Sequence, residues 1–231
     1  MSVTIDRLAG RVGLGDAHCV SSSRVTRHRL GAIMWGLRPV YLVIEVAVAA
    51  WSTARYSFVD NTISDLGAAE CTSIRRFGDP VPVCSPGHDL MNVAFIVSGA
   101  LMAVGAVLLY GRFGRGWLPA LLAMLLVMSG LSSIATGLTP LDLYPDGHVL
   151  AATPLFVAQP IALVLLGWLV RGERRRTGLA LMATGVLCGV GAALFIGVDQ
   201  AIGITERIAL WPVFLALVVA ARTPRSPAPP V

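Results

Sequence analysis

Residues 90–110 read LMNVAFIVSGALMAVGAVLLY, a run in which only Asn92, Ser98 and Tyr110 carry a polar side-chain atom. A helix needs roughly 20 apolar residues to cross a bilayer core ~30 Å thick. Six stretches of the chain have this character, the last of them shorter, namely 30–51, 90–110, 117–138, 148–170, 177–198 and 206–221. Because the runs are continuous rather than alternating, they exclude a transmembrane barrel. The sequence therefore predicts an all-α, six-helix transmembrane bundle.

Composition supports a membrane protein over a soluble one. Of 231 residues, 55% are hydrophobic and 13% are charged, and the mean hydropathy is +0.74. A soluble domain carries about a quarter charged residues. The net charge is +5, but the basic residues, all arginine, fall in short clusters between apolar runs. This pattern argues against intrinsic disorder and against nucleic acid as a partner.

The arginines predict the orientation of the bundle. Thirteen lie in the segments 1–29, 111–116, 171–176 and 222–231, and four lie in the other connections or at their edge, as Arg55, Arg75, Arg76 and Arg207. Cytoplasmic segments carry the excess of basic residues, so both termini are expected in the cytoplasm. Residues 1–29 are then a disordered cytoplasmic tail, 30–221 the membrane domain, and 222–231 a proline-rich tail.

The first outer loop, residues 52–89, is far longer than a helical hairpin needs. It contains Cys71 and Cys84, the two cysteines expected on the outer side. An oxidising exterior permits a disulfide between them. The alternative, a pair of metal-binding thiols, lacks the close spacing of a zinc site.

Two short motifs in this loop have local structural interpretations. Residues 60–67 resemble a single helical turn, capped by Asp60 or Asn61, that presents Ser64 and Asp65 near the membrane surface. A structural Asx-turn is the alternative.

The second motif predicts where the second span begins. Ser85 and Pro86 have the character of N-cap and N1 residues, which puts His88 and Asp89 in the first turn. The helix dipole would favour Asp89 as an anion there, although an ordinary helix-start acid is the simpler explanation of the residue.

The other outer loops add acids and a histidine. Asp142 and His148 precede or open the fourth span, and Glu206 and Arg207 open the sixth. In a six-helix bundle these groups are expected to converge on one outer polar pocket with Ser64, Asp65, His88 and Asp89. Histidine with carboxylates suits an acid–base pair or a divalent metal. No zinc-binding helix motif is present.

Three polar residues lie within the predicted spans. Arg38 and Glu45 are seven residues apart and share a helix face, and Gln159 lies on the same side of its helix as His148. Charged residues at this depth usually face the bundle interior. Glu45 is therefore expected to have a partner or a functional role there.

Motifs in the outer segments resemble the domain-of-unknown-function 998 family of bacterial and archaeal membrane proteins. They are Asn61-Thr-Ile-Ser-Asp-Leu-Gly67, Cys84-Ser-Pro with Met91-Asn92, Pro140 and Asp142 with His148, and Gly203-x-x-Glu206-Arg207. The resemblance covers residues 30–221 and implies a six-helix membrane fold, with no reaction. A looser similarity of the Ile-Ser-Asp turn to the Frag/DRAM/Sfk membrane proteins is an analogy.

Three functions are compatible with this pattern. The first is an outer site that binds or processes a lipid headgroup, in a hydrolase or transferase if it is catalytic. Its catalytic candidates are Ser64, Asp65, Asp142 and His148, and its ligand-binding candidates are His88, Asp89, Asn92, Glu206 and Arg207. The second is proton-coupled transport of a small solute through Glu45 and Gln159, and the third is a structural role in assembly. The expected location is a bacterial plasma membrane, with the lipid bilayer as partner and a divalent metal as one candidate cofactor.

Overall fold

The computed structural model of the chain describes residues 25–223, so most of the two predicted tails lies outside the described residues. Within this range, six helices are long and apolar enough to cross a membrane, as predicted. The elements are a helix over residues 25–37, α2 (Val40–Trp51), η1 (Ile63–Gly67), β1 (Thr72–Arg76), β2 (Asp79–Val83), α3 (His88–Leu109), α4 (Trp117–Leu138), α5 (Pro145–Val170), α6 (Arg175–Gly197) and α7 (Ile202–Arg222).

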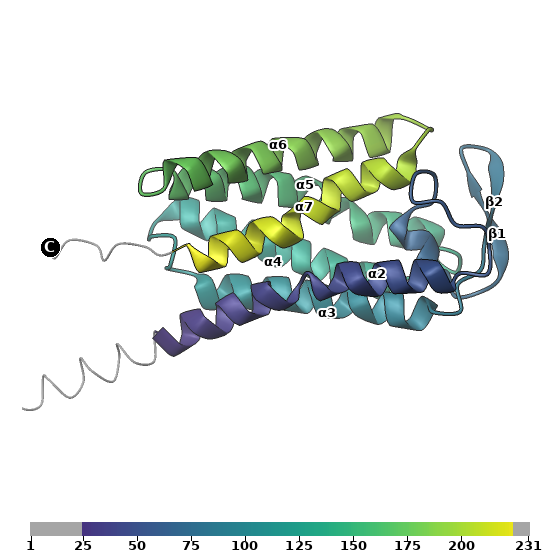
Figure 1. Cartoon of the computed structure of the whole chain (residues 1–231), viewed down its shortest axis with the longest axis horizontal. Helices are drawn as coiled ribbons and strands as arrows, with labels where there is room; N and C mark the ends of the chain where they lie inside the picture. The colour runs from purple at the N-terminus through teal and green to yellow at the C-terminus, as the bar shows by residue number, and fades with distance from the viewer. Residues whose placement is uncertain (1–24, 224–231) are drawn as a thin grey trace, which may run out of the picture.

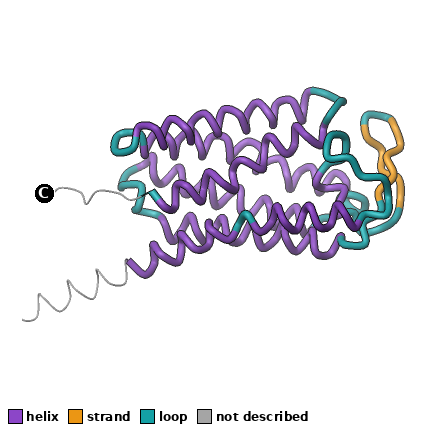
Figure 2. Tube along the Cα trace, viewed as in Figure 1, coloured by secondary structure: helices purple, strands orange, loops and turns teal. Residues whose placement is uncertain are grey.

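The long helices run side by side along one axis, and the antiparallel β1–β2 hairpin lies beyond their ends (Figure 1). We call this the hairpin end; it also carries the connections 139–144 and 198–201. The opposite end carries the connections 110–116 and 171–174. Figure 2 shows that the strands and the longest loop are confined to the hairpin end. The predicted first outer loop is thus the main extramembrane feature of the described chain.

The first span is interrupted, where the sequence predicts a continuous helix. Helical structure stops at Arg38–Pro39 and resumes at Val40, and Figure 2 shows this short break within the span. Proline lacks the N–H that an α-helix needs and crowds the preceding turn. The backbone N–H groups of Tyr41 and Leu42 donate instead to the carbonyls of Arg38 and Pro39, each at 3.0 Å.

The fourth and sixth spans begin earlier than predicted, at α5 and α7. α5 begins at Pro145, whose fixed φ suits the first helical turn. α7 begins at Ile202, so the sixth span has 21 residues and is not short. Glu206 and Arg207, which were expected to open this span, are both buried, and α7 begins one turn before them.

Close backbone contact joins α3 to α4. A Cβ atom added to Gly99 would lie 2.4 Å from the carbonyl oxygen of Gly130, and one added to Gly130 would lie 2.5 Å from that of Gly99. Small residues let membrane helices approach each other in this way. These contacts hold α3 and α4 close together, and the two helices support the loops of the hairpin end.

Candidate functional site

The short helix η1 is inserted into the hairpin end of the bundle. Ile63 and Leu66 are fully buried there, in a cluster with Val48, Met91 and Phe214 from three spans. Two apolar side chains thus anchor a segment that belongs to a loop. This insertion fixes the position of Ser64 and Asp65 between them in the sequence.

Thr62 caps η1, whereas the sequence favoured Asp60 or Asn61 as the cap. The Thr62 hydroxyl accepts from the backbone N–H of Asp65, and the Asp65 carboxylate accepts from the backbone N–H of Thr62. This is a capping box. Asp60 and Asn61 instead close the preceding turn through hydrogen bonds with Ser57.

The Asp65 carboxylate is fully occupied within its own loop. It accepts from the Thr62 hydroxyl at 2.8 Å and from the Asn61 amide at 3.2 Å, and it forms a salt bridge with Arg76 of β1. Arg76 therefore ties the hairpin to η1. Asp65 orients this loop, whereas the hydrogen bonds of the His148 ring go to Ser64 and Thr139.

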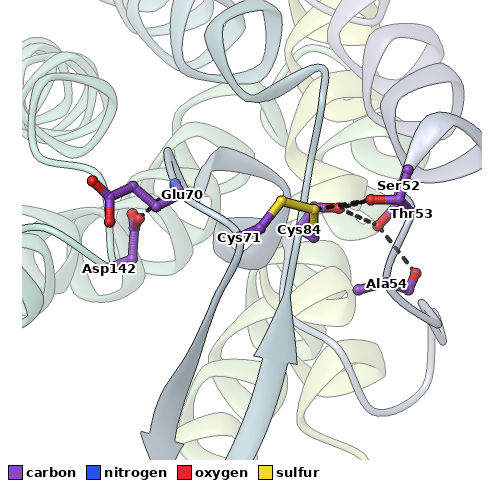
Figure 3. The surroundings of a disulfide bond; sticks show 7 residues. All are labelled: Ser52, Thr53, Ala54, Glu70, Cys71, Cys84 and Asp142. Carbon is purple, nitrogen blue, oxygen red and sulfur yellow. Dashed lines mark hydrogen bonds between the residues drawn. A yellow bond between two sulfur atoms is a disulfide. The ribbon is translucent and has the colours of Figure 1, made fainter.

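A disulfide between Cys71 and Cys84 closes the base of the hairpin (Figure 3). The Cys84 carbonyl accepts from the backbone N–H of Thr53 at 3.2 Å and from the Ser52 hydroxyl at 3.1 Å. The hairpin is thus fastened both to itself and to the end of α2. Cross-linking a loop of this length is worth about 3 kcal/mol in the chain-entropy model.

Asp142 joins the two longest connections at this end. Its carboxylate accepts from the backbone N–H groups of Ala69 at 2.9 Å and Glu70 at 2.8 Å, and Figure 3 shows it beside Glu70. A carboxylate that accepts two backbone N–H groups is a strong structural contact. The predicted catalytic candidate Asp142 therefore connects two loops.

Ser64 and His148 form a hydrogen-bonded pair although 84 positions separate them in the sequence. The Ser64 Oγ atom lies 2.8 Å from His148 Nε2, and His148 Nδ1 lies 2.7 Å from the carbonyl oxygen of Thr139. A carbonyl can only accept, so Nδ1 carries a proton. In the neutral imidazole Nε2 is then the acceptor, and the Ser64 hydroxyl donates to it.

Glu45 and Arg207 form a buried ion pair between α2 and α7. Arg207 Nε donates to Glu45 Oε1 at 3.0 Å, and the Trp211 indole donates to Oε2 at 2.9 Å. Arg207 Nη1 contacts the carbonyls of Phe58, Asn61 and Gly203 at 2.8–3.0 Å. Arg207 was predicted to hold an anionic ligand, but its donors are used to hold the loop before η1.

Two further groups complete this network. The Glu206 carboxylate accepts from the backbone N–H of Ile63, the first residue of η1. The Tyr56 hydroxyl donates to the Thr62 carbonyl at 2.9 Å and accepts from Arg207. Burial raises the pKa of Tyr56 above its ordinary value, which keeps the hydroxyl protonated as a donor. Both groups position η1.

His88 and Asp89, at the start of α3, do not take part in the hydrogen-bond network around η1. α3 begins at His88 after Gly87, with no side-chain cap, so Ser85 is not the N-cap that the sequence suggested. His88 Nδ1 lies 3.4 Å from the Asp89 carboxylate, and the Asp89 side chain is 94% exposed. Asn92 donates to the Gly67 carbonyl at 2.9 Å and holds the end of η1.

The polar residues within the spans are buried, as expected. Arg38 donates to the Ser98 carbonyl at 3.2 Å, and its guanidinium lies 4.6 Å from the centre of the Phe214 ring. Gln159 is buried on α5 and Glu45 on α2. They come from the same bundle interior, but none of the three lines the cavity described next.

A cavity of about 550 Å³ lies at the hairpin end. Four predicted site residues line it, namely Ser64, Asp142, His148 and Glu206. Its remaining wall is more apolar than the sequence suggested and includes Val149, Ala152, Phe156, Phe195 and Ile196. The rings of Phe156 and Phe195 stack with centroids 5.0 Å apart. The expected polar pocket is therefore a mixed cavity, with polar groups from the loops and apolar groups from α5 and α6.

Sequence reasoning missed Arg75 and Arg76, which line this cavity from β1. The signal available in the sequence was Gly78, a residue that favours a tight two-residue hairpin turn. In the structure this turn is Phe77-Gly78, and both φ angles are positive. Pro80 and Pro82 in the second strand obscured it because proline is rare in sheets except at edges. A two-stranded ribbon has only edges.

A metal site was one expectation for these residues. Among residues 25–223, no group of three or more His, Cys, Asp or Glu side chains is placed to hold a metal ion. The carboxylates of Asp65 and Asp142 bind protein donors instead.

Six apolar spans with a disulfide-closed, hydrogen-bonded loop domain at one end define a polytopic integral membrane protein. Residues 38–223 match the family described as "Protein of unknown function (DUF998)", and the chain belongs to that family. No curated protein and no solved structure matches the chain.

Proposed function

We propose that the cavity binds an anionic amphiphile, with its headgroup at the loops and its apolar part against α5 and α6. The observation that carries this proposal is the division of the cavity wall. Arg75, Arg76 and Ser64 line it from β1 and η1, and Phe156 and Phe195 line it from α5 and α6. A ligand that satisfies both parts has a charged group and an apolar chain.

The depth of the cavity suits such a ligand. Its α5 wall runs from Pro145 to Phe156. Eleven residues of α-helix rise about 16 Å, roughly half of a bilayer core. The volume of about 550 Å³ falls in the range of small-molecule sites.

Arg75 is the cation that we assign to the ligand. Arg76 is neutralised by Asp65. Arg75 is exposed, and no carboxylate in the described part of the chain pairs with it. A guanidinium binds carboxylate or phosphate oxygens through two parallel hydrogen bonds.

We further propose that the hairpin end faces the exterior of a bacterial plasma membrane. Nine arginines of the described chain lie at or next to the opposite end, as Arg27, Arg29, Arg112, Arg115, Arg171, Arg174, Arg175, Arg176 and Arg222. The excess of basic residues marks the cytoplasmic side. The disulfide is consistent with an oxidising compartment at the hairpin end.

Lipid retention tests this function. The purified protein is incubated with mixed phosphatidylglycerol and phosphatidylcholine, and bound lipid is counted by native mass spectrometry. We expect preferential retention of phosphatidylglycerol, reduced about tenfold by Arg75→Gln, since one charge-assisted contact is worth 1.5–3 kcal/mol. Arg55→Gln is the matched control because Arg55 is exposed at the same end and lies outside the cavity lining. Equal retention by the Arg75→Gln variant would contradict the proposal.

A further inference from the structure

We propose that Ser64 is a nucleophile and His148 its general base, and that the pair cleaves an ester of the bound amphiphile by acyl transfer. This inference rests on the proposed binding function of the cavity. It assigns the chemical class of the ligand, a carboxylic ester, and the atoms that act on it.

The geometry is that of an activated serine. A nucleophile, its base and a group that orients the base must lie within hydrogen-bond reach of one another. Ser64 Oγ, His148 Nε2 and the Thr139 carbonyl meet this condition at 2.8 Å and 2.7 Å. The backbone carbonyl performs the orienting part of the carboxylate's role in the Ser-His-Asp triad, since it holds the imidazole in the tautomer whose Nε2 accepts.

The pair is also placed where a ligand can reach it. Ser64 and His148 both line the cavity of about 550 Å³. Each is held on a fixed element, because Ile63 and Leu66 anchor η1 in the bundle and His148 lies in the first turn of α5. Sites held by rigid elements keep the geometry that catalysis needs.

Three buried serines of α4 show what a structural hydroxyl does in this bundle. Ser129, Ser132 and Ser133 of α4 each donate to a backbone carbonyl. A carbonyl is not a base of useful strength, whereas a neutral imidazole is. Ser64 thus has the partner that activation needs.

The reaction balances without a cofactor. Ser64 Oγ attacks the ester carbonyl carbon, and His148 Nε2 takes the hydroxyl proton. The bond from the carbonyl carbon to the alcohol oxygen breaks, and Nε2–H protonates the leaving alcohol. Water then attacks the acyl-serine with Nε2 as base, and the carboxylic acid leaves as Ser64 regains its proton. Arg75 supplies positive charge in the same cavity wall.

An alkyl fluorophosphonate tests the nucleophile directly. Its phosphorus forms a bond to an activated serine oxygen with loss of fluoride, and intact-protein mass spectrometry detects the adduct. We expect one adduct on the wild-type protein and none on Ser64→Ala. Ser85→Ala, from the same loop, and His88→Gln, from the first residue of α3, are matched controls outside the cavity lining and should label like the wild type.

The base is tested by chemical rescue. General-base assistance contributes about 10²–10⁴-fold, so His148→Ala should label at least 100-fold more slowly, and added imidazole should restore part of the rate. A structural role for His148 predicts loss of thermal stability and no rescue. Absence of rescue in a variant that unfolds at the wild-type temperature would overturn the assignment of the base.

Lipid retention separates this inference from the proposed function. If the fluorophosphonate fails to label the wild-type protein while phosphatidylglycerol is still retained, the assignment of Ser64 as nucleophile is overturned and the binding function stands. Labelling at Ser64 without preferential lipid retention would overturn the anionic amphiphile as ligand. Wild-type labelling that is unchanged in Ser64→Ala would also overturn the nucleophile.

Discussion

Glu45 and Arg207 are 162 positions apart in the sequence, yet Arg207 Nε lies 3.0 Å from Glu45 Oε1. Both side chains are almost fully buried. The same guanidinium contacts the backbone carbonyls of Phe58 and Asn61, just before η1. A pair inside the bundle therefore sets the position of the loop that carries Ser64. The transport hypothesis needs Glu45 to exchange protons, but its carboxylate is held by Arg207 and Trp211.

Removing one member of this pair should destabilise the protein. Arg207→Met leaves Glu45 as an unpaired buried charge, and breaking a buried pair costs about 3–5 kcal/mol. The double variant Glu45→Leu/Arg207→Met should recover part of this loss because no charge remains. The free energy of unfolding in mixed micelles measures both. Asp89→Asn is the control, since its side chain is 94% exposed; equal losses in the single and double variants would argue against an energetic role of the pair itself.

Reducing the disulfide should lower stability and loosen the hairpin. The Cys71–Cys84 bond closes a loop of 13 positions, for which the loss expected is about 3 kcal/mol. Thermal unfolding with and without a reductant measures it. The double variant Cys71→Ser/Cys84→Ser should unfold at the same lowered temperature as the reduced wild-type protein, and a reductant should not change its unfolding temperature further. Cys188→Ala serves as the control because Cys188 is a free cysteine.

Asp142→Ala should release the connection between the two loops. Its carboxylate holds the N–H groups of Ala69 and Glu70, so we expect faster hydrogen exchange at these two amides. Asp146→Ala is the control because Asp146 is an exposed acid close by in the first turn of α5. Unchanged exchange in Asp142→Ala would mean that these hydrogen bonds do not persist in solution.

Cysteine labelling tests the proposed orientation. In a variant with Cys19 and Cys188 replaced by alanine, Asp79→Cys at the exposed hairpin should react with a membrane-impermeant maleimide in intact cells. Arg175→Cys at the opposite end should react only after permeabilisation. The reverse pattern would place the hairpin end in the cytoplasm and remove the argument that it faces the exterior.

The sequence predicted the bundle because its signal is local. Each span needs a run of apolar residues of a set length, and this can be counted without knowledge of the other spans. The run at 90–110 and helix α3 (His88–Leu109) agree within two residues. The break at Pro39 was missed because the apolar run continues through it, although proline lacks the N–H that a helix needs. The early start of α7 was missed because the sequence does not show that Glu45 pairs with Arg207 and so lowers its cost in the membrane.

The site was harder to predict because its contacts are long-range. Asp65 and Asp142 are acids at the expected end, but only the structure shows that Arg76 and two backbone N–H groups occupy their oxygens. The Ser64–His148 contact joins η1 to α5. Residue type alone did not distinguish Ser64 and His148, which meet in the structure, from Asp89, which faces solvent.

Photo-crosslinking tests the central claim, that the cavity holds an amphiphile, most directly. A phosphatidylglycerol with a diazirine in the upper part of its acyl chain is irradiated with the protein in nanodiscs, and the adducts are mapped by peptide mass spectrometry. Thr153→Trp fills the cavity from α5, and Val157→Trp, one turn further on, is exposed outside its lining. We predict adducts at Ala152, Phe156 or Phe195 that Thr153→Trp abolishes and Val157→Trp leaves intact. Adducts spread over the exposed apolar residues of α6 and α7, and unchanged by Thr153→Trp, would contradict the account.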